Sequence, residues 1–172
     1  MNSSILLITI SGKDRPGIVG EIAAQVARRG GNWERSRLIH LAGRFVGLLQ
    51  ISVPEDRRED LRVDLLSVEG LAVTVAEGRI RTPEASSSFH LDLVGADHPG
   101  IVSEIFGKLS ALGLNVESLS TWTEAAADSG TVLFRAGADL SSAEPMRSEE
   151  IIEALEALAN DLLVEVSVSE PS

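Results

Sequence analysis

An internal repeat with an offset of 83 residues constrains this chain more than any other feature. The segment SGKDRPGIVGEI at residues 11–22 returns as VGADHPGIVSEI at residues 94–105. From residue 12 to residue 34, eleven of 23 positions keep their residue type in the second copy: Gly12/Gly95, Asp14/Asp97, Pro16/Pro99, Gly17/Gly100, Ile18/Ile101, Val19/Val102, Glu21/Glu104, Ile22/Ile105, Gly30/Gly113, Asn32/Asn115 and Glu34/Glu117. Two copies are too few for a solenoid, so each copy is expected to form a small domain.

The apolar residues within each copy switch between strand-like and helix-like spacing. In the first copy the pattern predicts strands over residues 4–11, 33–41, 44–53 and 71–77, and helices from Pro16 to Gly30 and over 55–67. In the second copy it predicts strands over residues 89–94, 115–124, 131–136 and 162–169, and helices over 99–112 and 149–159. The second copy is also expected to insert extra residues, Ala138–Ser148, between its third strand and second helix.

This order predicts an α+β fold of two tandem ferredoxin-like βαββαβ domains, each a four-stranded antiparallel sheet with two helices on one face. We expect domain 1 over residues 1–80, a linker over 81–88 and domain 2 over 89–172. The linker is placed there because residues 79–88, RIRTPEASSS, are polar and contain a proline and three consecutive serines. The other sheet face is expected to be partly apolar at Val46 and Leu48, and packing between domains or chains should cover it.

The charge of the chain excludes some functions. The formal net charge is -11, from 26 acidic and 15 basic residues, which argues against direct contact with nucleic acid. The one basic concentration is expected to be a solvated face: Arg28, Arg29, Arg35, Arg37 and Arg44. With no cysteine, disulfides and thiolate metal sites are excluded.

The sequence also predicts where the protein works. The N-terminal run MNSSILLITISGKD has the character of a first strand rather than a signal peptide, because it lacks a basic n-region. No stretch approaches the roughly 20 apolar residues that span a bilayer. We therefore expect a soluble, cytoplasmic protein without a membrane partner.

The repeated loop before the first helix is the candidate site. A helix N-terminus offers unpaired N–H groups and a partial positive charge, which favour a carboxylate or phosphate. Asp14 and Asp97 bring the opposite charge to the same place, so a ligand with both an ammonium and a carboxylate would suit the loop. Asn32 and Asn115 could add a side-chain donor and acceptor. The structural alternative stays open, because Asp, Pro and Gly are also ordinary helix-start and turn residues.

These residues resemble the ACT domain family. The resemblance rests on D-R-P-G-I-V and D-H-P-G-I-V, each followed by a helix that ends in G-G-N or G-L-N, and it covers both copies. A chain of only two such units is most similar to the glycine cleavage system transcriptional repressor group. That similarity implies a non-enzymatic regulatory protein, a homodimer that acts through a protein partner and regulates amino-acid metabolism or transcription.

In ACT domains that bind amino acids, the ligand lies between two units against this loop. The resemblance therefore implies ligand-binding residues in both copies: Asp14, Arg15, Pro16, Gly17, Ile18, Val19 and Asn32, and Asp97, His98, Pro99, Gly100, Ile101, Val102 and Asn115. Arg15 and His98 differ between the copies, so the two sites need not be equivalent. Many ACT units bind no ligand, and a ligand-free association module remains the alternative.

Other chemistry receives little support from the sequence. There are three histidines, of which His40 and His90 are expected in packing or surface roles and His98 near the ligand loop. No catalytic motif of the G-x-S-x-G or H-E-x-x-H type is present. We expect no enzyme activity, no catalytic residue, no metal and no cofactor. Trp33 and Trp122 are expected to pack in a core or an interface.

Overall fold

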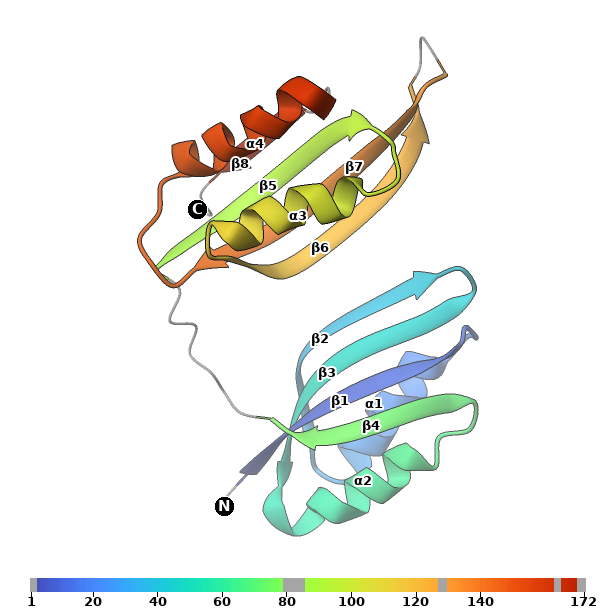
Figure 1. The fold of residues 1–172 in the computed structure, drawn as a ribbon. Coiled ribbons are helices and arrows are strands. Elements are labelled where there is room, and N and C mark those ends of the chain that lie inside the picture. The colour runs from blue at the N-terminus through green and yellow to red at the C-terminus, as the bar shows by residue number, and fades with distance from the viewer. Residues whose placement is uncertain (1–2, 79–85, 127–129, 163–164, 170–172) are drawn as a thin grey trace. The chain divides into compact units, whose positions relative to one another are not determined.

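The structure is a computed structural model that describes residues 3–78, 86–126, 130–162 and 165–169. The chain divides into two compact units, Met1–Thr82 (unit 1) and Pro83–Ser172 (unit 2), as Figure 1 shows. Residues 81–85 of the expected linker lie outside the described residues, and Ser87 and Ser88 already belong to a strand. That strand starts early because both serines pair with the neighbouring strand, Ser87 opposite Ser142 and Ser88 opposite Ser141.

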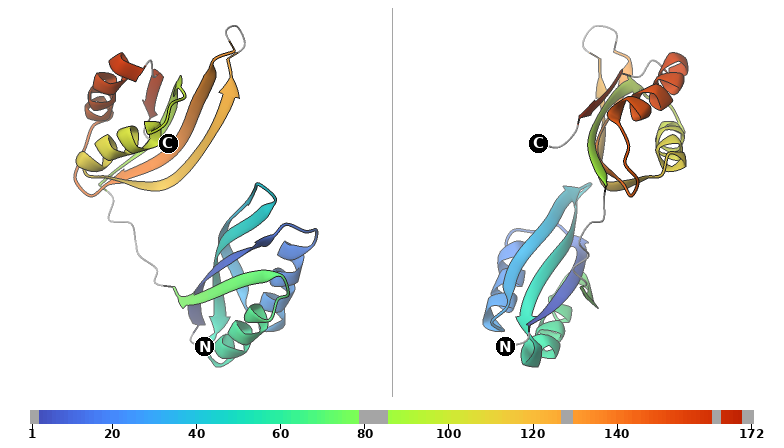
Figure 2. Two further views of the ribbon diagram at one scale, coloured as in Figure 1. Left: turned by 45° about the vertical axis from the view of Figure 1, so that its right-hand side comes forward. Right: turned by 90° about the vertical axis from the view of Figure 1, so that its left-hand side faces the viewer.

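Unit 1 has the expected βαββαβ order. Its elements are β1 (Ser3–Lys13), α1 (Ile18–Arg28), β2 (Asn32–Leu41), β3 (Arg44–Pro54), the 3-10 turn η1 (Glu55–Arg57), α2 (Arg58–Leu66) and β4 (Leu71–Glu77). The sheet order is β2-β3-β1-β4, and every neighbouring pair is antiparallel. Both helices lie on the same face of the sheet (Figures 1 and 2).

Unit 2 repeats this architecture. Its elements are β5 (Ser87–Ala96), α3 (Ile101–Ala111), β6 (Leu114–Ala125), β7 (Val132–Ser142), α4 (Ser148–Leu162) and β8 (Glu165–Ser169). The sheet order is β6-β7-β5-β8, again antiparallel throughout. The prediction of two tandem ferredoxin-like βαββαβ units is therefore confirmed.

Each unit builds its core between the sheet and the helices. In β1, Leu6, Ile8 and Ile10 alternate inward, as a two-residue period requires. The helices contribute residues four apart, Ile18, Ile22 and Val26 in α1 and the corresponding Ile101, Ile105 and Leu109 in α3. All of these side chains are buried, so the pattern read from the sequence identifies both cores.

The insertion expected over Ala138–Ser148 was wrong in its position. β7 continues to Ser142, because Ala138 and Leu140 extend the row of inward-facing residues that begins at Phe134. Only residues 143–147 connect β7 to α4. Unit 2 also differs from unit 1 in its second helix, since α4 has 15 residues and α2 has nine.

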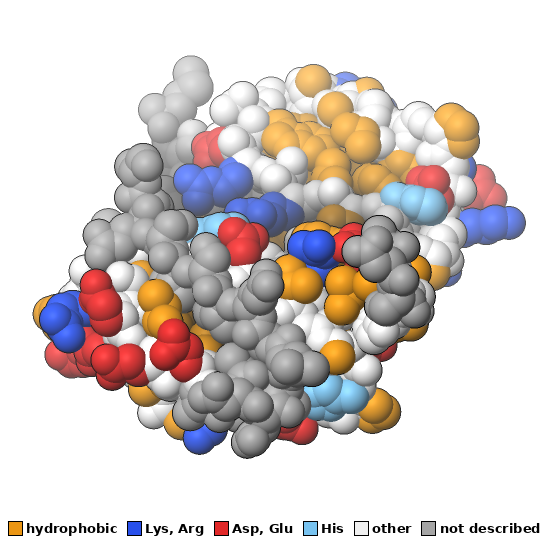
Figure 3. All heavy atoms as spheres, turned by 90° about the horizontal axis from the view of Figure 1, so that it is seen from above, with side chains coloured by type: hydrophobic (Ala, Val, Ile, Leu, Met, Phe, Trp, Pro, Cys, Tyr) orange, Lys and Arg blue, Asp and Glu red, His pale blue; other side chains and the backbone are white. Residues whose placement is uncertain are grey.

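The surface reflects the charge of the chain. Acidic side chains gather on part of the face drawn in Figure 3 (red), as expected with 26 aspartates and glutamates.

No helix among the described residues is both long and apolar enough for a bilayer crossing. Opposite the helices, each unit has a sheet face that no helix of the same unit covers, called its open face below.

Candidate functional site

Both repeated loops lead into a helix through a glycine with positive φ. Gly17 has φ 90° and Gly100 has φ 99°, values that L side chains rarely adopt. These glycines set the helix starts at Ile18 and Ile101, two residues later than Pro16 and Pro99 would suggest. Neither helix N-terminus receives a side-chain capping hydrogen bond. The first turns of α1 and α3 therefore retain donor groups that a ligand could use.

The two aspartates hold the same place in the two units. The backbone N–H of Asp14 donates to the Gly43 carbonyl over 3.1 Å, and that of Asp97 donates to the Val132 carbonyl over 2.9 Å. These bonds tie each loop to the neighbouring hairpin. Both carboxylates are exposed, and Asp14 Oδ2 lies 3.7 Å from His40 Nε2. His40 was not predicted to join this loop, because its strand is linked to the loop only through sheet pairing.

In unit 1 the residue after the aspartate is Arg15, and its side chain bonds to other residues of unit 1. Arg15 forms an ion pair with Glu21 on α1 and also donates to the Glu69 carbonyl over 3.3 Å. Glu21 is identical in the repeat, as Glu104, but its role is not evident from the sequence. Arg15 thus brings a partner carboxylate to the first turn of α1.

In unit 2 the same position carries a histidine with one unused nitrogen. His98 Nδ1 lies 3.2 Å from the Pro99 carbonyl oxygen, whereas its Nε2 atom is buried without a hydrogen-bond partner among the described residues. Among the described residues Glu104 forms no ion pair with an arginine, and a Cβ on Gly100 would lie 3.5 Å from its Oε1 atom. The two loops are consequently different in chemistry.

The apolar members of the predicted site divide into two groups. Ile18 and Ile101 are buried in the cores of their units, so they anchor the helices instead of facing a ligand. Val19 and Val102 are 43% and 42% exposed, and the preceding prolines and glycines are exposed too. An accessible loop surface therefore consists of the aspartate, the proline, the glycine and the valine.

The two asparagines lie far from the loops of their own units. Asn32 is opposite Ser52 on β3, whereas Lys13, beside the loop, is opposite Arg44. Eight residues of strand separate Ser52 from Arg44, which corresponds to about 26 Å. Asn115 occupies the same place in unit 2 and donates to Glu117 over 2.7 Å. Neither unit alone brings its asparagine to its loop.

Glu34 and Glu117, which are identical in the repeat, have the same structural role in their units. The ladder slips by one residue at each of them, so both lie in a β-bulge. A hydrogen bond from Ser52, followed by one from Gln50, lowers the pKa of Glu34, and Ser141 followed by Asn115 does the same for Glu117. The G-x-N-x-E pattern thus marks a bulge whose glutamate carboxylate accepts hydrogen bonds from the neighbouring residues. The spacing of apolar residues could not reveal this bulge.

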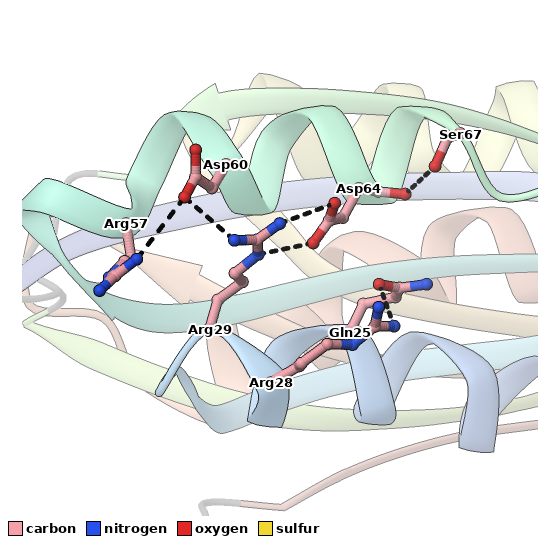
Figure 4. A network of polar contacts seen from close by, with 7 residues as sticks. All are labelled: Gln25, Arg28, Arg29, Arg57, Asp60, Asp64 and Ser67. Atoms are coloured by element: carbon pink, nitrogen blue, oxygen red, sulfur yellow. Dashed lines mark hydrogen bonds and ion pairs between the residues drawn. The ribbon is translucent and has the colours of Figure 1, made fainter.

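A polar network in unit 1 joins the end of α1 to α2 (Figure 4). Arg29 donates to both carboxylate oxygens of Asp64, over 2.7 and 3.1 Å, and to Asp60 over 3.0 Å. These bonds lower the pKa of Asp64. Beside the network lies an open cavity of about 410 Å³, lined by Arg28, Arg29, Gly30, Pro54, Asp56 and Arg57. Two of its three arginines, Arg29 and Arg57, form ion pairs with aspartates, whereas Arg28 donates to Gln25.

His90 lies on the open face of unit 2 between two carboxylates. Its Nδ1 is 2.8 Å from Asp139 and its Nε2 is 3.6 Å from Asp92. The hydrogen bond with Asp139, aided by the charge of Asp92, raises the pKa of His90. Ser118 donates to Asp139 and not to the imidazole, so this group lacks the arrangement of an activated serine. Within the described residues no three His, Asp or Glu side chains are grouped to hold a metal ion.

The comparisons with known proteins agree with this geometry. Residues 4–75 match the family model of the ACT domain. The match lies within unit 1 and runs from β1 into β4, including the loop at Asp14. No curated protein matches the chain.

Two solved structures extend the likeness to both units. The crystal structure of an unknown protein from Galdieria sulphuraria has a TM-score of 0.85 at 23% identity, covering 99% of this chain and 100% of that one. A crystal structure assigned as a glycine cleavage system transcriptional repressor has a TM-score of 0.68 at 19% identity, with the same coverage. At such identities the likeness shows the fold, which is that of two tandem ferredoxin-like βαββαβ units.

Proposed function

We propose that this chain is a non-enzymatic regulatory protein that binds a small amino acid at interfaces formed by its loops and acts through protein–protein contacts. The observation that carries the proposal is the doubled loop. Each copy places an exposed aspartate next to a helix N-terminus without a side-chain cap. The backbone N–H groups would donate hydrogen bonds to the carboxylate of an amino acid, and the aspartate would pair with its ammonium group.

The similarity to the glycine cleavage repressor structure supports a role in amino-acid metabolism or in transcription. The net charge of -11 favours action through a protein partner over direct binding to DNA. The proposal includes a homodimer, since the loop and the asparagine of one unit lie at opposite ends of its sheet. A complete site therefore needs surfaces from more than one unit.

A ligand-free association module is the second candidate. It is favoured by the carboxylates that each unit already holds at its first helical turn. Glu21 is paired with Arg15 in unit 1, and Glu104 lies over Gly100 in unit 2. A carboxylate near a helix N-terminus partly satisfies the charge that would attract a ligand.

Thermal unfolding in the presence of each standard amino acid separates the two candidates. A ligand that binds the native state raises the melting temperature by mass action, and one at 100 times its Kd adds about 2.7 kcal/mol. Asp14→Ala and Asp97→Ala should each reduce that shift. Asp56→Ala is the matched control, because Asp56 is exposed on η1 and belongs to neither loop. If no amino acid at millimolar concentration shifts the wild-type protein, the association module is supported instead.

A further inference from the structure

The open face of unit 1 combines exposed apolar side chains with cations. The sheet register shows which residues share this face, because Ile10, Gly47 and Leu38 pair in one row and face the helices. The neighbouring rows face the opposite way. They present the apolar residues Leu7, Ile39, Leu41, Val46 and Leu48 and the cations Lys13, Arg35, Arg37 and Arg44.

These four cations have no carboxylate partner among the described residues. Among the other described arginines, Arg28 donates to Gln25, and ion pairs are formed by Arg15, Arg29, Arg57, Arg58, Arg62, Arg135 and Arg147. In a chain with 26 acidic and 15 basic residues, unpaired cations gathered around an apolar centre form a distinct surface. Glu34 is the one carboxylate that reaches this face, through its bond with Gln50.

The open face of unit 2 is rich in carboxylates, and it has neutral residues at the positions of Arg35 and Arg37. The 83-residue offset places Ser118, Ser120 and Glu124 where unit 1 has Arg35, Arg37 and Leu41. The offset places Asp92 where unit 1 has Thr9, and the sheet register places Asp139 at the position of Gln50. With Glu117, the described part of this face has four carboxylates against Arg135 and His90, and Trp122 lies on it 49% exposed.

We infer that the open face of unit 1 docks on the open face of unit 2 of a second copy of this chain. The inference goes beyond the proposed function, because it names the surfaces and needs no ligand. Arginines paired with carboxylates and with an exposed tryptophan are favourable contacts at an interface. Applied in both directions, the same contact forms twice and closes a two-fold dimer.

Two other occupants fit these observations less well. Two copies of the unit 1 face would bring eight unpaired cations together, which costs free energy. Nucleic acid would match the arginines, but the exposed centre of Ile39, Val46 and Leu48 offers it no phosphate contact. A protein surface that is acidic at its rim satisfies both features.

Sedimentation velocity at low ionic strength tests the inference with a charge swap. The first variant is Arg35→Glu with Arg37→Glu, and the second is Asp92→Arg with Glu124→Arg; all four side chains are exposed. Each variant alone places like charges at both contacts, so its dimer affinity should fall by about a hundredfold. An equimolar mixture restores opposite charges at both contacts and should return the mass of two chains.

Arg28→Glu with Arg62→Glu is the matched control, since it makes the same change in net charge on α1 and α2 and should leave the dimer intact. Thermal unfolding verifies that every variant is folded, and Ile39→Ser serves as a neutral replacement for any that is not. A monomeric wild-type protein, dimeric single variants or a monomeric mixture would overturn the inference. So would a monomer that binds a short DNA duplex through Arg35 and Arg37.

Discussion

Arg29 and Asp64 form a two-pronged contact, with Nε to Oδ2 at 2.7 Å and a second bond of 3.1 Å from the same guanidinium group. The contact joins the residue after α1 to a residue on α2 that lies 35 positions later. In unit 2 the corresponding position is Leu112, which packs against the core instead. The two copies thus close the same helix end by different means.

The first prediction concerns this pair. Arg29→Ala should lower the melting temperature at neutral pH. Arg29 holds the pKa of Asp64 below its ordinary value of 3.8, so the stabilisation is present above that pH and is lost as the pH falls through the lowered value. Calorimetric scans from pH 7 to pH 3 should show the difference shrinking. Arg28→Ala should give a smaller difference, because Arg28 donates to Gln25 and acts on Asp64 through its charge alone; an unchanged difference at pH 3 for Arg29→Ala would contradict the assignment.

The second prediction concerns His90, whose pKa is raised by Asp139 and Asp92. A raised folded-state pKa contributes stability that is complete below the unfolded value near 6.5 and disappears as the pH rises through the folded value. An NMR titration of the imidazole should give a midpoint above 6.5. Asp139→Asn should move that midpoint down, and a midpoint that stays in place would show that Asp139 is not the cause.

The third prediction compares identical core positions of the two copies. Ile22 and Ile105 are each 1% exposed, so Ile22→Ala and Ile105→Ala should each lower the free energy of unfolding by about 2–5 kcal/mol. Denaturant titrations followed by circular dichroism measure the loss. Val19→Ala and Val102→Ala are the controls, because these side chains are largely exposed and should change stability by less than about 0.5 kcal/mol. Equal losses for core and control variants would refute the assignment of these positions.

The fourth prediction tests a tight backbone approach before the ligand loop. A Cβ on Gly12 would lie 2.5 Å from the Gly70 carbonyl oxygen, and backbone cannot give way cheaply. Gly12→Ala should therefore destabilise unit 1 by about 1–3 kcal/mol. Gly20→Ala should instead stabilise it by up to about 1 kcal/mol, since that helical position has open space. Chemical unfolding of the two variants should give shifts of opposite sign.

Local patterns account for most of the fold. The two-residue alternation of β1 and the four-residue spacing of α1 depend only on near neighbours, and both identify the buried residues correctly. In the second copy, the sequence pattern did not predict that the third strand continues beyond residue 136, because the small residues Ala136 and Ala138 carry a weak apolar signal. The pairing of β7 with β5 decides that strand's length, and pairing is a property of the sheet.

Of the candidate site, the sequence located the loops but not their contacts. The repeat marked Asp14 and Asp97, yet it could not show that Arg15 meets Glu21 or that Asn32 lies at the far end of the sheet. It also left Glu34 and Glu117 without a role, since a bulge depends on the opposite strand. Such contacts join residues that are distant along the chain.

The sequence by itself determined that this protein is two copies of one βαββαβ unit, because repetition and hydrophobic period are written along the chain. Tertiary structure alone decided what each copy presents to its surroundings. Sheet register brings Arg35, Arg44 and Lys13 from three strands to one face, and the same register in unit 2 gathers Asp92, Asp139 and Glu124. The net charge of a sheet face depends on residues from strands that become neighbours only after folding. For that reason two similar sequences form open faces of opposite net charge.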